Sequence, residues 1–594
     1  MAVIVVLTLL AVFALPWVTP VTVRAIQSDS QAVGFNNRIA VLGLFAGMLA
    51  LFFHGVLSKP ACSDQQAPLI STRLTSVEGR VSMRLQLTVV VVTATAVALL
   101  ASVWQTHPTG DAAYFIDKLN RVIAGGAPYS QIEFSYGPLM LYLPLLTWRL
   151  VGWTGLSVYA VYYAWVALSY VLGVRLAVYV LDRVRLARST KNLGVAIVTA
   201  FTLLYPTLGL NYSPLRYLLP YAVLVWVLQR LTTASRARGA HAILPLAGVL
   251  ATTAVSPEMG MALLAALGVS LVVLAITDPR AYAPALATLL VGSAAGAAVM
   301  LASAGATTLR AFTGGAYAFP VLPALPALVL VGAALLSARH TGCAAGTRSH
   351  EGAALQLGWL VLAAALLTPA LGRADFVHVF WNGLGVIVLC AAAIENTHGR
   401  GTPYLAVVGA IFLCMMAVYL STAFVPQIRS AYTSHWTARR ESASAGEKAA
   451  ALRIAALPAL AYPGHLQGEI GARLTTSDSL VPMYAPPAGA LAGDDLRLIS
   501  EQMSRAQHVA LPTAMLDSYL AAAESATPDS DGVVMVVPTV VGGDLYRILL
   551  GFPARFRGRN AVLSPTVTFG LLLQRDWIAY ETIEGYTLLR RKDR

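Results

Sequence analysis

With 594 residues, 57% of them hydrophobic and 12% charged, and a mean hydropathy of +0.68, the chain exceeds what a soluble core needs and indicates a polytopic membrane protein. The net charge of +13 is uneven, because residues 1–424 hold 24 Lys and Arg against 12 Asp and Glu, whereas residues 425–594 hold 17 against 16. A basic excess confined to the hydrophobic part reports membrane orientation and argues against nucleic acid as a partner.

Hydrophobic windows of about 19 residues predict about thirteen membrane-spanning helices. The first has no basic region before it and no convincing cleavage site, so we interpret it as a retained helix rather than a signal peptide. The expected fold class is an α-helical polytopic membrane protein followed by a small C-terminal α/β extramembrane domain. The predicted spans are 2–19, 39–57, 86–104, 156–181, 193–210, 217–232, 242–256, 259–276, 284–302, 321–337, 354–370, 379–394 and 404–424.

The basic residues predict the orientation of these spans. When the sides alternate, fifteen Lys and Arg fall in one set of loops, with clusters around Arg80 and Arg185. The richer side is cytoplasmic by the positive-inside rule. The amino terminus is then cytoplasmic, and the chain after Phe424 is external, or periplasmic, at the cell inner (plasma) membrane. This solution requires Pro138–Val151 to be a helix lying in the membrane interface rather than a span.

The four cysteines predict no disulfide framework. Cys62 and Cys343 fall in loops expected to be cytoplasmic, and Cys390 and Cys414 fall within spans. The external tail contains no cysteine. Reducing conditions in the cytoplasm keep thiols free, so this distribution agrees with the predicted orientation.

Three regions follow from the spans. Residues 1–85 hold two helices and a cytoplasmic loop, residues 86–424 form the main transmembrane domain with an external loop at 105–155, and residues 425–594 form the external domain. This last region is expected to begin with a polar helix and to continue through loops to strands. The runs typical of strands are Gly532–Val541, Asn560–Val567 and Trp577–Arg590.

The segment Gly110–Leu139 is polar although it directly follows a span. A helix over Asp111–Ala124 would place one apolar stripe toward the membrane or protein, with Asp117, Lys118 and Arg121 facing elsewhere. Gly125, Gly126 and Pro128 would end it. The segment therefore predicts a helix lying in the interface, whose apolar stripe comprises Phe115, Leu119, Val122 and Ile123.

Asp111 is the leading candidate for chemistry. A carboxylate beside a membrane-embedded cavity can accept a proton from an attacking hydroxyl as a general base. The alternative is that Asp111 only caps the helix that it opens. Glu133 and Tyr136 lie in the loop QIEFSYGP, where Glu133 is equally well explained as a solvated surface residue. Glu258, in AVSPEMG, interrupts a hydrophobic hairpin, where an ionisable group is costly. It is therefore expected either to line a functional cavity or to make a buried structural hydrogen bond.

Three arginines lie on the side that orientation rules disfavour. Arg216, Arg310 and Arg373 are at outer span ends, where an anionic ligand would favour them because guanidinium binds phosphate in a bidentate manner. The alternative is contact with headgroups or a local pair such as Arg373 with Asp375, and this alternative is the better one for Arg310. Asp375 and His378 add an anion and a titratable imidazole to the Arg373 end.

Four features follow one another in this segment: an acid after an early span, a helix with an aromatic residue, the pattern G-G-x-P-Y ending at Tyr129, and an aromatic-Gly-Pro-Leu at Tyr136–Leu139. Together they resemble the first external loop of GT-C glycosyltransferases. Protein O-mannosyltransferases and lipid A aminoarabinose transferases are of that class. The resemblance implies an enzyme that takes a sugar from a polyprenyl-phosphate carrier on the outer face, with Asp111 as the catalytic acid of the loop. Two features depart from the pattern: two spans precede the loop, and the usual Asp-Glu pair is Asp111-Ala112.

The resulting hypothesis is an inverting glycosyltransferase with a polyprenyl-phosphate-linked donor and a glycan, lipid or protein acceptor. Asp111 would deprotonate the acceptor hydroxyl, and Arg216 or Arg373 would meet the donor phosphate. A divalent metal is compatible with the sequence and not required by it. The alternatives are a transporter or flippase of lipid-linked glycans and a membrane scaffold. The other expected substrate-binding residues are Tyr129, Glu133, Tyr136, Glu258, Asp375 and His378.

Overall fold

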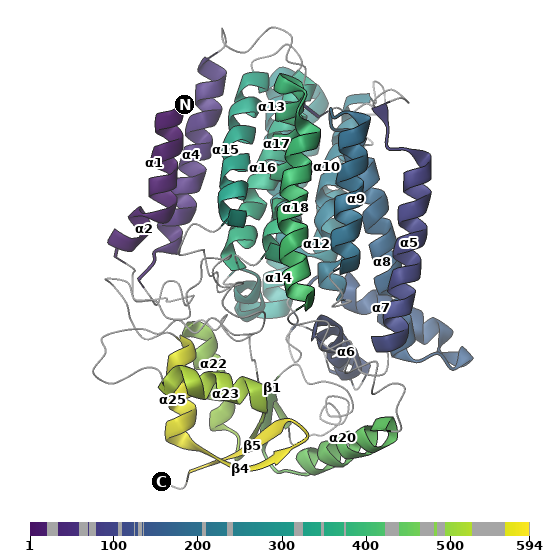
Figure 1. Ribbon diagram of the computed structural model, residues 1–594, viewed down its shortest axis with the longest axis vertical. Helices are drawn as coiled ribbons and strands as arrows, with labels where there is room; N and C mark the ends of the chain where they lie inside the picture. The colour runs from purple at the N-terminus through teal and green to yellow at the C-terminus, as the bar shows by residue number, and fades with distance from the viewer. Residues whose placement is uncertain are drawn as a thin grey trace.

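The computed structural model of the protein describes most of the helices and much of the C-terminal region. It shows a bundle of long helices with a smaller α/β domain at one end (Figure 1). The described residues are 1–20, 34–58, 69–70, 79–104, 110–123, 125–126, 128, 134, 136–204, 209–233, 241–313, 325–345, 350–373, 376–421, 439–463, 480–483, 493–524 and 565–592.

Nine helices in the described part of the chain are long and apolar enough to cross a membrane. The multi-pass membrane class predicted from composition is therefore confirmed. These helices are α4 (Asn37–Leu57), α5 (Met83–Trp104), α8 (Val158–Leu181), α13 (Pro257–Thr277), α14 (Pro279–Thr313), α15 (Leu325–Ala345), α16 (His350–Arg373), α17 (Phe376–His398) and α18 (Gly401–Tyr419).

Four further helices coincide with the remaining predicted spans. They are shorter or less apolar, so they do not by themselves establish the count of thirteen. Helix α1 is followed by the single turn α2 (Leu15–Val18). The four are α1 (Ala2–Phe13), α9 (Arg188–Leu204), α10 (Pro214–Thr233) and α12 (Leu244–Val255).

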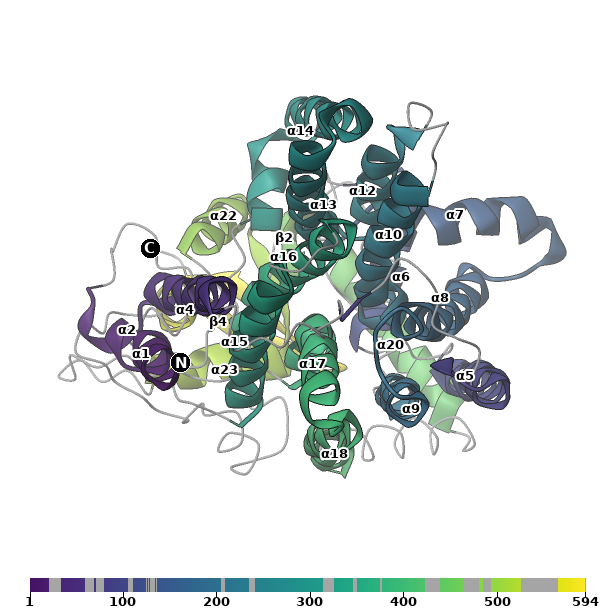
Figure 2. The same ribbon diagram turned by 90° about the horizontal axis from the view of Figure 1, so that it is seen from above.

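The bundle is built around α17. In its span 89% of the residues are buried, whereas only 17% are buried in the spans of α5 and α14, which face outward. Seen along the bundle, α5 and α14 lie at the periphery (Figure 2). The amino terminus lies at one end of the bundle, and the C-terminal domain lies at the other (Figure 1). An odd number of crossings produces this arrangement.

Helices α6 (Gly110–Ile123) and α7 (Leu139–Val151) lie at the end of the bundle that carries the C-terminal domain (Figure 1). Both were predicted as helices, and α7 runs sideways rather than through the bundle (Figure 2). A short helix η4 (Gly152–Thr154) joins α7 to α8. At the end of α6, Gly125 adopts φ +99° and the Gly126 N–H donates to the Arg121 carbonyl, which is the predicted glycine termination.

The polar face of α6 is buried as well as the apolar one. Asp117, Lys118 and Arg121, which were predicted to lie off the apolar stripe, are 2%, 1% and 6% exposed. The reason is tertiary, because α6 lies between the bundle and the C-terminal domain (Figure 1). The predicted apolar stripe is buried at Phe115, Leu119 and Val122, while Ile123 is 38% exposed.

The C-terminal domain contains a five-stranded sheet in the order β2-β1-β3-β5-β4. The first three strands are parallel, and β5 pairs antiparallel with both β3 and β4. This bears out the predicted small α/β domain. Its elements are α20 (Arg439–Ala455), β1 (Leu460–Pro463), β2 (Leu480–Met483), α22 (Gly493–Ser504), β3 (His508–Pro512), α23 (Thr513–Glu524), α25 (Pro565–Asp576), β4 (Trp577–Ile583) and β5 (Tyr586–Arg591).

The predicted strand runs have three outcomes. Trp577–Arg590 forms the hairpin β4–β5, as predicted. Gly532–Val541 lies outside the described residues. The described end of Asn560–Val567 opens helix α25 at Pro565, so a strand there is wrong, and proline at a first helical position explains the preference.

The cysteine prediction is also corrected. Cys343 is disulfide-bonded, and its partner lies outside the described residues. Cys390 and Cys414 are free. The end of α4 packs closely on this site, because a Cβ on Gly55 would overlap the backbone of Arg339. This contact between α4 and α15 could not be predicted, because Gly55 and Arg339 are far apart in the sequence.

Candidate active site at the end of the bundle

Asp111 lies in the first turn of α6, one residue inside the helix. Its Oδ1 accepts a hydrogen bond of 3.0 Å from the Asn211 Nδ2 amide. Asn211 belongs to the short helix η5 (Leu210–Tyr212), which joins α9 to α10. A side chain at Gly209 would overlap both Asp111 and Asn211, so the glycine allows η5 to approach α6 this closely. The carboxylate is therefore held in one orientation from outside its own helix.

Tyr136 joins the same group. The Asn211 Nδ2 also donates to the Tyr136 hydroxyl, at 3.0 Å. The next residue, Gly137, donates its backbone N–H to the Val255 carbonyl, and a Cβ at Gly137 would overlap Ala254. The loop that carries Tyr136 is thus fixed on the connection between α12 and α13. The first turn of α6, the loop before α7 and η5 thus meet at one asparagine.

Arg216, in the first turn of α10, is the buried cation of this group. It is 8% exposed. Its Nη1 donates to the Asn211 carbonyl at 2.8 Å, and its Nε donates to the Ser256 hydroxyl at 3.1 Å. Its guanidinium carbon also lies 5.1 Å from the centre of the Tyr136 ring. Arg216 therefore fixes η5, and Asn211 in η5 fixes the Asp111 carboxylate.

Glu258 is the acid that pairs with Arg216. It lies in the first turn of α13, and its Oε1 pairs with the Arg216 Nη2. The Glu258 side chain is 34% exposed, whereas that of Arg216 is 9% exposed. The carboxylate thus reaches the accessible edge of the group while the guanidinium stays inside. An ionisable group at this hairpin faces a protein partner, which was one of the two expectations for Glu258.

His378 reaches the group through Tyr212. Its Nε2 lies 3.4 Å from the Tyr212 hydroxyl, and Tyr212 directly follows Asn211 in η5. Arg373 is the last residue of α16, five positions before His378. The end of α16 and the start of α17 therefore lie near η5. Asp375, Tyr129 and Glu133 lie outside the described residues, as does the side chain of Arg373.

Four of the predicted residues meet in one connected network: Asp111, Tyr136, Arg216 and Glu258. Sequence reasoning missed Asn211, which connects them, and Ser256. A signal was present, since Gly209 and Asn211 lie in a polar turn between two apolar helices, at the same predicted membrane face as Asp111.

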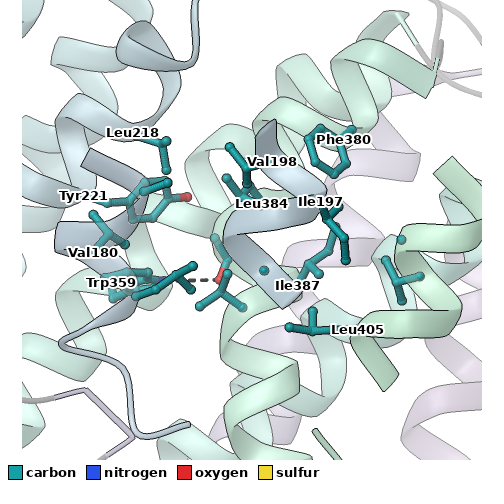
Figure 3. Close-up of a pocket in the computed structure, with 17 residues that line it drawn as sticks. Val180, Ile197, Val198, Leu218, Tyr221, Trp359, Phe380, Leu384, Ile387 and Leu405 are labelled. Carbon is teal, nitrogen blue, oxygen red and sulfur yellow. Dashed lines mark hydrogen bonds between the residues drawn. The ribbon is translucent and has the colours of Figure 1, made fainter. Parts of the chain in front are cut away.

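A cavity of about 40 Å³ lies deeper in the bundle, between α8, α9, α10, α16, α17 and α18 (Figure 3). Its walls are apolar, and Tyr221 points into it from α10 (Figure 3). The Trp359 indole N–H donates to the Gly385 carbonyl at 3.2 Å beside it. Such walls cannot bind a phosphate or a sugar, so this cavity is separate from the polar group around Asp111.

Within the described residues, no group of three or more His, Cys, Asp or Glu side chains is placed to hold a metal ion. The neighbours of Asp111 are an amide and tyrosines. Asn211 and Tyr136 contribute neutral oxygen and nitrogen atoms, and Glu258 is paired with Arg216.

No family profile matches the sequence, and no curated protein matches it. The structure is similar to that of ArnT from Cupriavidus metallidurans bound to undecaprenyl phosphate, with 13% identity over 84% of this chain and 97% of that chain, and a TM-score of 0.37. It is also similar to the Archaeoglobus fulgidus oligosaccharyltransferase in the apo form, with 13% identity over 73% of this chain and 70% of that chain, and a TM-score of 0.39.

The same oligosaccharyltransferase in complex with zinc and sulfate gives 12% identity and a TM-score of 0.36, over 73% of this chain and 69% of that chain. At these identities and TM-scores the similarities carry no argument about family or activity. The function must come from the side chains.

Proposed function

We propose that the protein is an integral-membrane glycosyltransferase that moves a sugar from a polyprenyl-phosphate carrier to an acceptor hydroxyl on the outer face of the membrane. The observation that carries this proposal is the hydrogen bond from Asn211 to Asp111, at the membrane end that also carries the α/β domain. The Asn211 amide fixes one oxygen of this carboxylate, and the Asn211 carbonyl accepts from the buried guanidinium of Arg216. A candidate base and a buried cation are thus connected through one residue.

Asp111 would act as the general base. It would take the proton of the acceptor hydroxyl while that oxygen attacks the anomeric carbon from the face opposite the phosphate. The bond between the anomeric carbon and the phosphate oxygen would break, releasing polyprenyl phosphate and inverting the configuration. Asn211 would orient the carboxylate, because a fixed donor on Oδ1 limits rotation of the side chain.

The two outer arginines would have different roles. The Arg216 guanidinium is engaged by Glu258, Ser256 and the Asn211 carbonyl, so a donor phosphate would have to compete with Glu258 for it. We therefore assign to Arg216 the positioning of η5 and a positive potential near the leaving group. Arg373, at the end of α16, would be the direct phosphate ligand. Tyr136 and Glu258 would line the sugar site, with Tyr129, Glu133, Asp375 and His378 as further candidates.

The α/β domain would bind or shape the acceptor that approaches Asp111. One of its parallel strands, β1, contacts α6 through Tyr462 and Arg121. Its position restricts which hydroxyls can approach Asp111, so it would select among glycan, lipid and protein acceptors. The amino terminus would be cytoplasmic and the domain external, since the basic loops lie at the opposite end of the bundle.

The test is a transfer assay with purified protein in lipid vesicles, using a panel of radiolabelled polyprenyl-phosphate sugars and a membrane extract as acceptor source. The expected result is label in an acceptor, with release of polyprenyl phosphate, in the wild-type protein and not in Asp111→Asn. Label that crosses the vesicle membrane while it stays attached to its lipid would instead identify a transporter or flippase. A protein that does neither, with every donor tested, would contradict both functions.

A further inference from the structure

Three charged residues of α6 are buried and are not used by the proposed reaction. Arg121 Nε lies 3.0 Å from Asp117 Oδ2, and Lys118 Nζ lies 3.6 Å from the same oxygen. Burial raises the pKa of the Asp117 carboxyl, while the charges of Arg121 and Lys118 oppose that rise. Two cations and one anion are thus placed together away from water.

Arg121 also joins α6 to the α/β domain. Its guanidinium carbon lies 4.8 Å from the centre of the Tyr462 ring. Tyr462 is 2% exposed and belongs to β1, which is paired on both sides, with β2 and with β3. The ring is therefore held on a rigid strand inside the sheet. A cation over an aromatic face is favourable, and more so where water is excluded.

This arrangement is poor for stability alone. Desolvating charges is costly, and an apolar contact of similar volume is often at least as stable. Moreover, Asp117 Oδ1 and Arg121 Nη2 have no hydrogen-bond partner among the described residues. The arrangement instead fixes the orientation of α6 relative to β1, because the salt bridge and the ring contact both depend on the orientation of one guanidinium group.

We infer that Arg121 and Tyr462 form a joint that sets the position of α6, and with it Asp111, against the α/β domain. Asp111 lies in the first turn of this 14-residue helix, and Arg121 lies in its last turn. Asn211 holds the first end and Tyr462 holds the second. Arg121 is thus a positioning residue, and this inference rests on the proposed function for its catalytic consequence.

The experiment compares two changes at one position in the full-length protein in lipid nanodiscs. Tyr462→Phe keeps the ring but removes the hydroxyl, which also interacts with Arg121, whereas Tyr462→Leu removes the ring as well and keeps only an apolar side chain. Arg121→Gln removes the cation from the other side. Arg497→Gln is the control, since Arg497 is an exposed residue of α22 in the same domain, paired only along its own helix with Glu501 in the described structure.

Two readouts are needed. Hydrogen exchange of the backbone amides of α6 reports the joint without any assumption about activity. Tyr462→Leu and Arg121→Gln should each speed this exchange by roughly tenfold, the effect of one buried cation–π contact. The exchange in α7 and α8 should stay as in the wild type. Transfer kinetics report the consequence: kcat should fall with little change in the donor KM, and Tyr462→Phe, which loses only the hydroxyl contact, should be affected less than Tyr462→Leu.

A double variant separates the joint from general damage. If Arg121 and Tyr462 act through each other, Arg121→Gln with Tyr462→Leu should be no worse than either change alone. Additive losses, or unchanged α6 exchange in Tyr462→Leu, would overturn the joint. Faster exchange with unchanged kcat would overturn its role in positioning Asp111. A wild-type protein without transfer activity would contradict the proposed function, while the exchange measurement would still decide the joint.

Discussion

Asn211 and Asp111 are joined by a hydrogen bond of 3.0 Å, from the amide Nδ2 to the carboxylate Oδ1, although 100 positions separate them in the chain. The same amide nitrogen bonds the Tyr136 hydroxyl, and the Asn211 carbonyl accepts from Arg216. One side chain and its backbone therefore connect the α6 segment, the loop before α7 and the start of α10. The orientation of the proposed base and the position of the buried Arg216 guanidinium both depend on this residue.

The first prediction concerns Asp111. Asp111→Asn keeps the size and the polarity of the side chain but removes the proton acceptor. We expect kcat to fall by roughly 10²–10⁴-fold, the usual contribution of a positioned base. The melting temperature should change little. Single-turnover transfer and thermal unfolding of the same detergent-solubilised samples measure the two quantities.

The control for Asp111→Asn must be an acid without buried partners. Asp117 is unsuitable, because its carboxylate is 0% exposed and paired with Arg121. Glu351 is exposed in the first turn of α16, at the opposite end of the bundle, so Glu351→Gln should leave transfer unchanged. Full activity in Asp111→Asn would end the assignment of this residue as the base.

The second prediction concerns Asn211. Asn211→Leu removes the donor that orients Asp111 and leaves the Tyr136 hydroxyl without that partner. We expect a loss of roughly tenfold or more in kcat, because one buried hydrogen bond to a charged group is worth about 1.5–3 kcal/mol. Asn211→Gln should recover part of this loss, since the amide is retained at a changed distance. Equal activity in Asn211→Leu and the wild type would show that the carboxylate needs no external orientation.

The third prediction concerns the Arg216–Glu258 pair. Removing one member of a buried ion pair costs about 3–5 kcal/mol, because the other charge is left uncompensated. Glu258 is partly exposed, so we expect Glu258→Gln to cost less than Arg216→Leu. Denaturant unfolding of both single variants and the double variant measures the coupling, expected to be about 0.5–3 kcal/mol. Additive losses would mean that the two residues act independently.

The fourth prediction concerns topology. A reporter fused after Arg594 should behave as external, and one fused before Met1 as cytoplasmic, since the two ends of the chain lie at opposite ends of the bundle. The disulfide at Cys343 bears on the same point, because disulfides persist in oxidising compartments, whereas the basic loops predict a cytoplasmic position for this end. Alkylation of Cys343 by a membrane-impermeant reagent, with and without reduction, shows which side of the membrane Cys343 faces and so decides between the two arguments.

Sequence patterns were sufficient for the elements that the bilayer dictates. Each of the thirteen predicted spans coincides with a helix, because a span must be long and apolar wherever it packs. The sideways course of α7 followed from the same reasoning, since a further crossing would have moved the Arg185 cluster to the other side. The glycine end of α6 was predictable from its local chemistry alone.

The parts that failed depend on contacts between distant segments. Nothing local to α6 shows that Tyr462 will cover Arg121, so the burial of its charged residues could not be predicted. The role of Asn211 is of the same kind, because its neighbours in the chain describe only a turn. Asp111 and Arg216 were predictable as individuals because charge at a membrane face is unusual. Their connection required the structure.

The fifth prediction concerns Gly209, where space rather than charge is tested. Its φ of −84° suits any residue, so a side chain there brings no backbone strain. A Cβ would nevertheless overlap Asp111 and Asn211, and Gly209→Ala should push η5 away from α6. The expected cost is about 1–3 kcal/mol in stability, with a larger relative loss in kcat than in donor KM because the carboxylate moves. Gly268→Ala is the matched control, since a Cβ at that position of α13 meets no atom within 4 Å and alanine favours the helix. Measured together by thermal unfolding and transfer kinetics, Gly268→Ala should match the wild type or exceed its stability. Wild-type kinetics in Gly209→Ala would show that the close approach of η5 to Asp111 is not needed for the reaction.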